Sequence, residues 1–191
     1  MLLHELVRTG IRKILDEVKG LKVIGEASTG EEAVQFCRKN EPDVVLMDMN
    51  MPGIGGLEAT KKIIRYSPDI KIIVLTVYTE DPIPTKVMQI GAAGYLTKSA
   101  GPDEMVNAIR AVNSGQRYIT PDIAQQMALS QFKSSEENPF NLLSERELQI
   151  MLSSKTINSY RYRMFEKLNV GNDVELTHLA IRHGMLKTEK L

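Results

Sequence analysis

The chain has 191 residues, of which 42% are hydrophobic and 25% charged, a composition typical of globular proteins. Its 24 basic and 24 acidic residues give no formal net charge, which argues against a general polyanion binder. No stretch reaches the roughly 18 consecutive apolar residues that a membrane-spanning helix needs, and no charged-then-apolar leader opens the chain. We therefore expect a cytoplasmic protein that does not contact a membrane, with a length that suits two domains.

Residues 4–115 alternate between helical and strand-like patterns. Val7, Ile11 and Leu15 share one face of a helix predicted over 4–20, and residues 21–27 (LKVIGEA) read as a strand. Further helices are predicted over 30–40, 56–66, 82–90 and 102–115, and further strands over 43–48, 71–76 and 94–97. Helices between short, continuously apolar strands are typical of a parallel sheet that is covered on both faces.

The remainder of the chain has a different character. Residues 121–132 can form a helix, and the polar segment 134–139 (SSEENP) ends in proline and suits a linker. Ser144 and Glu147, three residues apart before an apolar run, form a predicted capping box. Helical patterns over 155–168 and 174–186 follow, so we expect a small all-helical second domain.

Three polar residues stand at the ends of predicted strands: Asp48 after VVLM, Thr76 after IIVL and Lys98 after GYLT. The carboxyl ends of parallel strands meet at one edge of the sheet, where such folds bind ligands. Lys98 can pair with a phosphate and Thr76 can donate a hydrogen bond to it. The pattern therefore predicts that Asp48 is a nucleophile that forms an aspartyl-phosphate.

The segments DVVLMDMNMPGIGGLEA, IIVLT and GAAGYLTK resemble the receiver domain of bacterial two-component response regulators. This resemblance implies a flavodoxin-like, doubly wound α/β fold with strand order 2-1-3-4-5. It implies that Asp48 is the phosphoacceptor, Thr76 the switch hydroxyl, Tyr95 the aromatic switch residue and Lys98 the phosphate-pairing lysine. It also implies a Mg²⁺ cofactor bound by Asp48 and the backbone carbonyl of Asn50, because a hard cation lowers the charge cost of phosphorylating a carboxylate.

The segments LSERELQIML, KTINSYRYRMFEKLNV and VELTHLAIRHGML resemble the LuxR-type helix-turn-helix output domain. Together the two resemblances indicate a response regulator of the NarL/FixJ family, in particular of the GacA/UvrY group. They imply a receiver domain at 1–116, a linker with a helix at 117–141, and a DNA-binding domain at 142–191. They also imply a transcription regulator that is not an enzyme, with a BarA/GacS-like sensor histidine kinase, promoter double-stranded DNA and a second copy of itself as partners.

The helix predicted over 155–168 is the candidate recognition helix. Residues 153–170 carry four basic residues and one acidic residue, a pattern that also fits a solvated surface helix. The resemblance assigns Asn158, Ser159 and Tyr162 to bases in the major groove. It assigns mainly to phosphates the residues Lys155, Thr156, Arg161, Arg163 and Lys167. A candidate dimer face on the last helix is formed by Leu176, Leu179 and Ala180.

The chain departs from the family pattern at two places. Receivers of this type open with a strand that ends in two acids, which hold Mg²⁺, whereas this chain starts MLLHELVR and has no such pair before His4. Leu152 and Ser153 adjoin where the family has a scaffold helix and a turn. Either the protein lacks these segments, or the sequence represents the remaining parts of a longer polypeptide.

Two alternative functions stay open from the sequence. The segment from Asp48 to Asn50 resembles the nucleophile loop of an aspartate-dependent phosphatase, although those enzymes usually have a second Asp where Asn50 stands. A receiver-type binding module that has lost phosphorylation becomes the best interpretation of all if the acidic pair is really absent. Magnesium-dependent labelling by acetyl phosphate separates the regulator from the binding module, and hydrolysis of small phosphate esters would indicate the enzyme.

Overall fold

The computed structural model describes residues 2–79, 82–130, 142–144, 147, 164–183 and 185, with only the backbone described for 2–6 and 130. The chain divides into two compact units. Unit 1 comprises residues 1–77 and 87–120, and unit 2 comprises 78–86 and 121–191. Among the described residues, no helix has both the length and the apolar character needed to cross a membrane.

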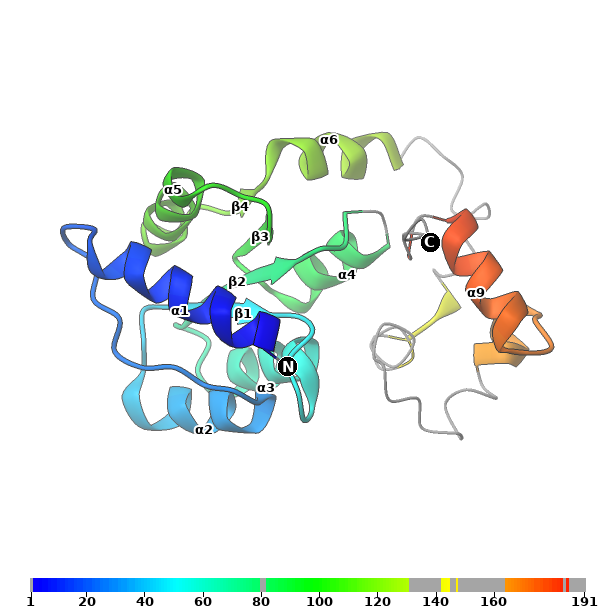
Figure 1. Ribbon diagram of the computed structural model, residues 1–191, viewed down its shortest axis with the longest axis horizontal. Helices are drawn as coiled ribbons and strands as arrows, with labels where there is room; N and C mark the ends of the chain where they lie inside the picture. Colours follow the sequence, from blue (N-terminus) through cyan, green and yellow to red (C-terminus); the bar gives the residue numbers. More distant parts are fainter. Residues whose placement is uncertain are drawn as a thin grey trace. The chain divides into compact units, whose positions relative to one another are not determined.

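Residues 2–119 form alternating helices and parallel strands (Figure 1). Their order is α1 (Leu2–Asp16), α2 (Gly30–Asn40), β1 (Val44–Asp48), α3 (Gly55–Tyr66), β2 (Lys71–Thr76), α4 (Ile83–Ile90), β3 (Gly94–Thr97), α5 (Pro102–Asn113) and β4 (Tyr118–Ile119). The strands pair in parallel in the order β1-β2-β3-β4. The predicted α/β class is confirmed, because the apolar strands are covered by the helices that connect them.

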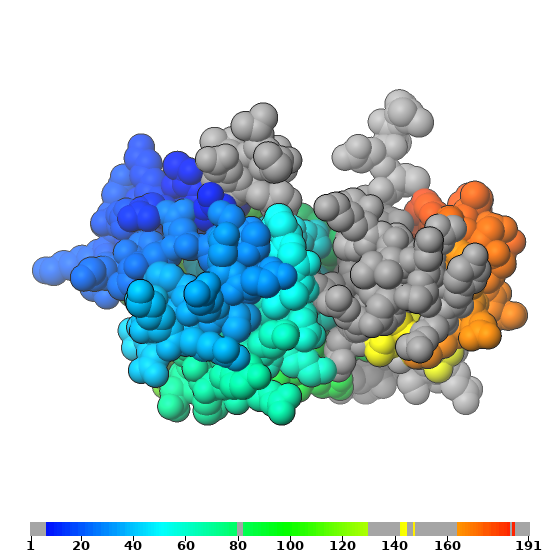
Figure 2. Space-filling view, turned by 90° about the horizontal axis from the view of Figure 1, so that it is seen from below, coloured from blue at the N-terminus to red at the C-terminus, as the bar shows by residue number. Residues whose placement is uncertain are grey.

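Helices cover both faces of this sheet. On one face lie α1 and α5, and on the other lie α2 and α3 (Figure 1). The blue residues of α2 and the cyan residues of α3 lie side by side in the view from below (Figure 2). The core on the first face consists of side chains from α1, β2, β3 and α5: Leu15, Ile73, Leu75, Leu96, Met105, Val106, Ala108, Ile109 and Val112. Fully burying one such aliphatic side chain contributes roughly 1.5–3 kcal/mol. This packing fixes the strand ends that carry the candidate site.

The prediction that residues 21–27 form a strand is wrong, since the structure assigns them no regular secondary structure. A strand requires a neighbouring backbone for its hydrogen bonds, and the described sheet ends at β1. The strand order predicted by resemblance, 2-1-3-4-5, therefore gives way to the four-stranded order in the described residues. The short strand β4 was not predicted, because two residues are too few to show a pattern.

Unit 2 contains α6 (Pro121–Ser130), a helical segment at 164–168 and α9 (Asp173–Arg182). The predicted capping box is confirmed: the Ser144 N–H donates to Oε2 of Glu147 at 2.9 Å, and the Glu147 N–H donates to Oγ of Ser144 at 3.4 Å. The dimer face predicted on α9 is wrong for Leu176 and Ala180. Both side chains are buried, so they are core residues and not a free surface. Leu179 is half-buried.

Candidate functional site

Asp48 is the last residue of β1, and its carboxylate lies at the carboxyl edge of the sheet. The Asn50 N–H donates to Oδ1 at 2.9 Å, which is the local turn that Asp forms with the backbone two residues on. The Lys98 ammonium donates to Oδ2 at 2.7 Å. The Asp48 side chain is 25% exposed and that of Lys98 is 19% exposed, so the ion pair is accessible from solvent but not fully hydrated. Both carboxylate oxygens are thus held in place.

The parallel register brings Lys98 to Asp48 from 50 residues away. The ladder extends one residue beyond each strand: the Met49 N–H donates to the Leu75 carbonyl at 3.1 Å, and the Lys98 N–H donates to the Thr76 carbonyl at 2.7 Å. Met49 and Lys98 therefore both lie just beyond the carboxyl ends of their strands. The structure brings together Asp48 and Lys98, which the sequence placed at two strand ends.

Thr76 and Tyr95 lie on neighbouring strands and are both completely buried. The Thr76 hydroxyl donates to Sδ of Met49 at 3.9 Å, a weak bond to a soft acceptor. The Tyr95 carbonyl accepts from the Thr120 N–H at 3.1 Å. In this conformation the Thr76 hydroxyl therefore contacts a soft sulfur acceptor in the core.

Gly56 is a functional residue that the analysis of the sequence missed. Its N–H donates to the Met49 carbonyl at 3.1 Å, which joins the start of α3 to the end of β1. A Cβ atom at Gly56 would lie 2.0 Å from the carbonyl oxygen of Asp48, far inside van der Waals contact. The paired glycines at 55 and 56 were the available signal, because a residue without Cβ permits this close approach.

The oxygen atoms near Asp48 determine which metal ion could bind there. Among the described residues no three His, Cys, Asp or Glu side chains gather into a metal-binding group. Asp48 and the carbonyl of Asn50 are two oxygen donors, and Mg²⁺ is commonly bound by one or two carboxylates with water and phosphate oxygens completing its shell. The residues present fit Mg²⁺ in this minimal form.

Most of the candidate DNA-contacting residues, 155–163, lie outside the described residues. Lys167 is described, and its ammonium donates to Oε2 of Glu147 at 2.7 Å. Burial alone raises the pKa of Glu147, but hydrogen bonds from Lys167 and Ser144 outweigh it, and the pKa lies below its ordinary value. Lys167 therefore holds the carboxylate with which Glu147 caps the Ser144 N–H.

Comparisons with known families match two separate parts of the chain. Residues 4–110 match the response regulator receiver domain. Residues 149–180 match the luxR family of bacterial regulatory proteins. The receiver match covers both Asp48 and Lys98, and the second match covers the whole candidate recognition helix.

Two curated relatives align over nearly the whole chain. Response regulator UvrY of Escherichia coli strain K12 is 64% identical over 206 residues, covering 98% of this chain and 94% of UvrY. Response regulator GacA of Pseudomonas aeruginosa is 55% identical over 201 residues, covering 96% of this chain and 94% of GacA. Because the alignment with UvrY is longer than the 191 residues of this chain, UvrY contains residues with no counterpart here.

Solved structures agree with this assignment. A LuxR-family two-component response regulator from Aurantimonas superposes with a TM-score of 0.65 at 38% identity, covering 68% of this chain and 93% of that one. The Salmonella typhimurium RcsB response regulator gives a TM-score of 0.62 at 26% identity, covering 93% of this chain and 94% of that one. The chain therefore belongs to the LuxR-type response regulators, the transcription regulators of two-component systems, and within them to the GacA/UvrY group.

Proposed function

We propose that Asp48 is the residue that accepts the phosphoryl group, within a receiver domain at 1–116. The observation that supports this role is the ion pair from Lys98 to Asp48 at the carboxyl edge of a parallel sheet, with one carboxylate oxygen held by the Asn50 N–H. A linker at 117–141 and a DNA-binding domain at 142–191 complete the proposed organisation.

In the proposed transfer, an oxygen of the Asp48 carboxylate attacks the phosphorus of a phosphohistidine on the sensor kinase. The new O–P bond forms as the P–N bond breaks, and the kinase histidine leaves as imidazole. Lys98 moves its hydrogen bonds from Oδ2 to the phosphoryl oxygens, while the Asn50 N–H keeps the carboxylate oriented. Asp48 and the Asn50 carbonyl would hold Mg²⁺, which would supply positive charge to offset the negative charge of the phosphoryl group.

The added charge then shifts a two-state receiver. The Thr76 hydroxyl, which donates a weak hydrogen bond to Sδ of Met49 in this conformation, turns toward a phosphoryl oxygen, and Tyr95 follows into the space that it leaves. This step would change receiver dimerisation or release the DNA-binding domain. The side chains of Thr76 and Tyr95 therefore act as positioning residues for the switch.

The output proposed for the second domain is promoter recognition in the cytoplasm by a homodimer. Asn158, Ser159 and Tyr162 would read bases, and the basic residues around them would bind phosphates. A BarA/GacS-like sensor histidine kinase would supply the phosphoryl group, in keeping with the likeness to UvrY and GacA. The role is regulatory and not enzymatic.

Labelling of the full chain by acetyl phosphate with Mg²⁺, followed by intact mass and peptide mapping, tests the proposal. Asp48→Asn removes the nucleophile and should abolish the mass increase of one phosphoryl group. Asp43→Asn is the matched control, because Asp43 is exposed just before β1, at the end opposite Asp48, and this variant should be labelled no differently from the wild type. Labelling that persists in Asp48→Asn would overturn the assignment.

A second candidate function rests on the donor set at the site. With a single described carboxylate beside Lys98, a receiver-type binding module that works without phosphorylation is the alternative. It predicts no labelling of the wild type at any Mg²⁺ concentration, together with DNA binding that acetyl phosphate leaves unchanged. The same experiment therefore decides between the two.

A further inference from the structure

A shallow hollow lies between α2 and α3, the two helices that pack side by side on one face of the sheet (Figure 2). Its volume is about 520 Å³. Val34, Arg38 and Lys39 line it from α2, and Lys62 and Tyr66 line it from α3. Val34 is buried, whereas Arg38, Lys39 and Tyr66 are exposed. The hollow therefore has an apolar side chain at its base and a basic, aromatic rim.

Tyr66 contributes a flat aromatic surface to this hollow. It is the last residue of α3, and it is 56% exposed. The guanidinium carbon of Arg38 lies 4.0 Å from the ring centroid, over one face of the ring, and this cation–π contact holds the ring in place. A residue that is more than half exposed cannot have both ring faces covered, so the opposite face is open. An open aromatic face beside cations is the kind of surface on which nucleic-acid bases stack.

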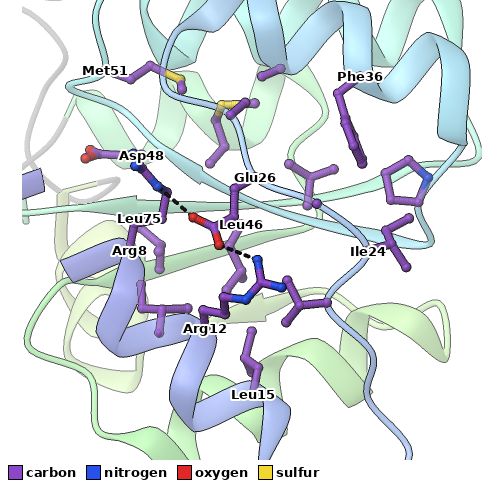
Figure 3. Close-up of a pocket in the computed structure, with 18 of the residues that line it drawn as sticks. Arg8, Arg12, Leu15, Ile24, Glu26, Phe36, Leu46, Asp48, Met51 and Leu75 are labelled. Carbon is purple, nitrogen blue, oxygen red and sulfur yellow. Dashed lines mark hydrogen bonds and ion pairs between the residues drawn. The ribbon is translucent and has the colours of Figure 1, made fainter. Parts of the chain in front are cut away.

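The basic residues near β1 differ from those of the hollow, because carboxylates already neutralise them. Arg8 and Arg12 of α1 both donate to the carboxylate of Glu26, as Figure 3 shows. Lys98 donates to Asp48. A cation that is paired in this way has little attraction left for a further anion. Those residues therefore do not form a second anion-binding surface.

The basic residues of the hollow keep most of their charge. Within the described part of the chain, neither Arg38 nor Lys39 forms an ion pair with a carboxylate. Lys62 lies 3.9 Å from Glu58, a long ion pair between side chains that are 45% and 33% exposed. The acidic residue Glu31 lines the hollow from the first turn of α2, about 10 Å along the helix from Arg38. Three basic residues against one acid favour a ligand with several negative charges.

We propose that this hollow binds single-stranded nucleic acid, with a base stacked on the open face of Tyr66 and the adjoining phosphates on Lys39 and Lys62. The shallow shape favours a strand that passes across it, because pockets for free nucleotides and other small ligands enclose most of the ligand. An acidic peptide would match the charges but would leave the aromatic face unused. The proposal does not rest on the proposed function, because none of these residues belongs to the Asp48 site or to the recognition helix.

Fluorescence anisotropy of a labelled RNA strand of eight adenosines, titrated with the full chain at about 50 mM salt, tests the proposal. Binding should be saturable. A strand of the same length built from abasic units carries the same phosphates without bases. It should bind about tenfold more weakly, because stacking on Tyr66 is lost.

Variants of Tyr66 locate the stacked base. Tyr66→Leu keeps an apolar side chain but removes the flat face, and it should weaken binding of the adenosine strand about tenfold. Tyr66→Phe keeps the face and should bind like the wild type. Because Tyr66 is exposed, both variants should unfold in urea at the wild-type midpoint to within the effect of one surface contact.

Variants of lysine residues locate the phosphates. Lys39→Gln should reduce the slope of log affinity against log salt concentration by about 0.7, the value for one phosphate contact on a single strand. Lys13→Gln is the matched control, because Lys13 is exposed on α1 and does not line the hollow. It should leave the slope unchanged.

Three results would each overturn the proposal. The first is the absence of saturable binding. The second is equal binding of the abasic strand, or equally strong competition by polyglutamate, since either would show attraction to charge alone. The third is unchanged affinity in Tyr66→Leu, which would place the bound strand elsewhere on the chain.

Discussion

The Nζ atom of Lys98 lies 2.7 Å from Oδ2 of Asp48, although 50 positions separate the two residues in the sequence. Two crossovers of a parallel sheet produce this contact, and the Asn50 N–H fixes the other carboxylate oxygen. A carboxylate held in this way is oriented before any phosphoryl donor arrives. The arrangement explains why β1, an apolar strand, ends in a charged residue.

Lys98→Ala should slow labelling of Asp48 by acetyl phosphate by about tenfold or more. A hydrogen bond between charged groups is worth about 1.5–3 kcal/mol, and the ammonium is the described cation that contacts the site. Rates come from intact-mass measurements at a fixed concentration of donor. Lys62→Ala, which removes a surface lysine 3.9 Å from Glu58, controls for the loss of one positive charge. Equal rates for Lys98→Ala and the wild type would show that Lys98 does not assist transfer.

Gly56→Ala should destabilise unit 1 by about 1–3 kcal/mol, the usual cost of overpacking. Its Cβ would lie 2.0 Å from the Asp48 carbonyl oxygen, and backbone cannot move aside as a flexible side chain can. Gly10→Ala is a control of opposite sign: Gly10 lies inside α1 with nothing within 4 Å of a Cβ. It should stabilise by up to about 1 kcal/mol. Urea unfolding measures both, and a neutral Gly56→Ala would contradict the predicted clash.

Thr76→Val should leave the fold stable to within about 1 kcal/mol, since it keeps the shape of the buried side chain and removes a weak hydrogen bond to sulfur at 3.9 Å. It should nevertheless abolish the change in DNA affinity that phosphorylation causes, measured by fluorescence anisotropy with and without acetyl phosphate. Thr60→Val is the comparison, because the buried Thr60 hydroxyl in α3 has no hydrogen-bond partner within the part of the chain that the structure describes. That variant should be at least as stable as the wild type and should respond normally. An intact response in Thr76→Val would rule out the switch role.

Acid should destabilise the second unit through Glu147. Its pKa in the folded chain lies below the unfolded value of about 4.3, so its stabilising effect is complete above about pH 5 and is lost as the pH falls through the folded pKa. Hydrogen exchange of peptides from 164–183 reports the loss. Glu147→Gln should flatten this pH dependence, whereas Glu166→Gln, at an exposed position, should not. If both variants follow the wild type, the pair with Lys167 does not govern acid stability.

Periodicity in the sequence was sufficient to predict most of unit 1. The strand 71–76 and the helix 30–40 have the predicted bounds, because continuous apolar runs and a capped amphipathic pattern depend on local residues alone. The sequence also predicted that Asp48 and Lys98 lie at the same edge of the sheet, since parallel strands align their carboxyl ends. The resemblance to receiver domains then supplied the predicted switch roles of Thr76 and Tyr95, which the chemistry of these side chains alone does not indicate.

Other features depended on partners that are distant in the sequence. Residues 21–27 have a strand-like pattern, yet a strand forms only where a second backbone accepts its hydrogen bonds. Leu176 and Ala180 repeat along one helical face, but only the packed domain decides whether that face meets the core or a second copy. The hollow between α2 and α3 and the pairing of Lys167 with Glu147 likewise come from three-dimensional packing. The sequence by itself determined the elements and the chemistry at their ends, and the tertiary structure decided which edges and faces remained open.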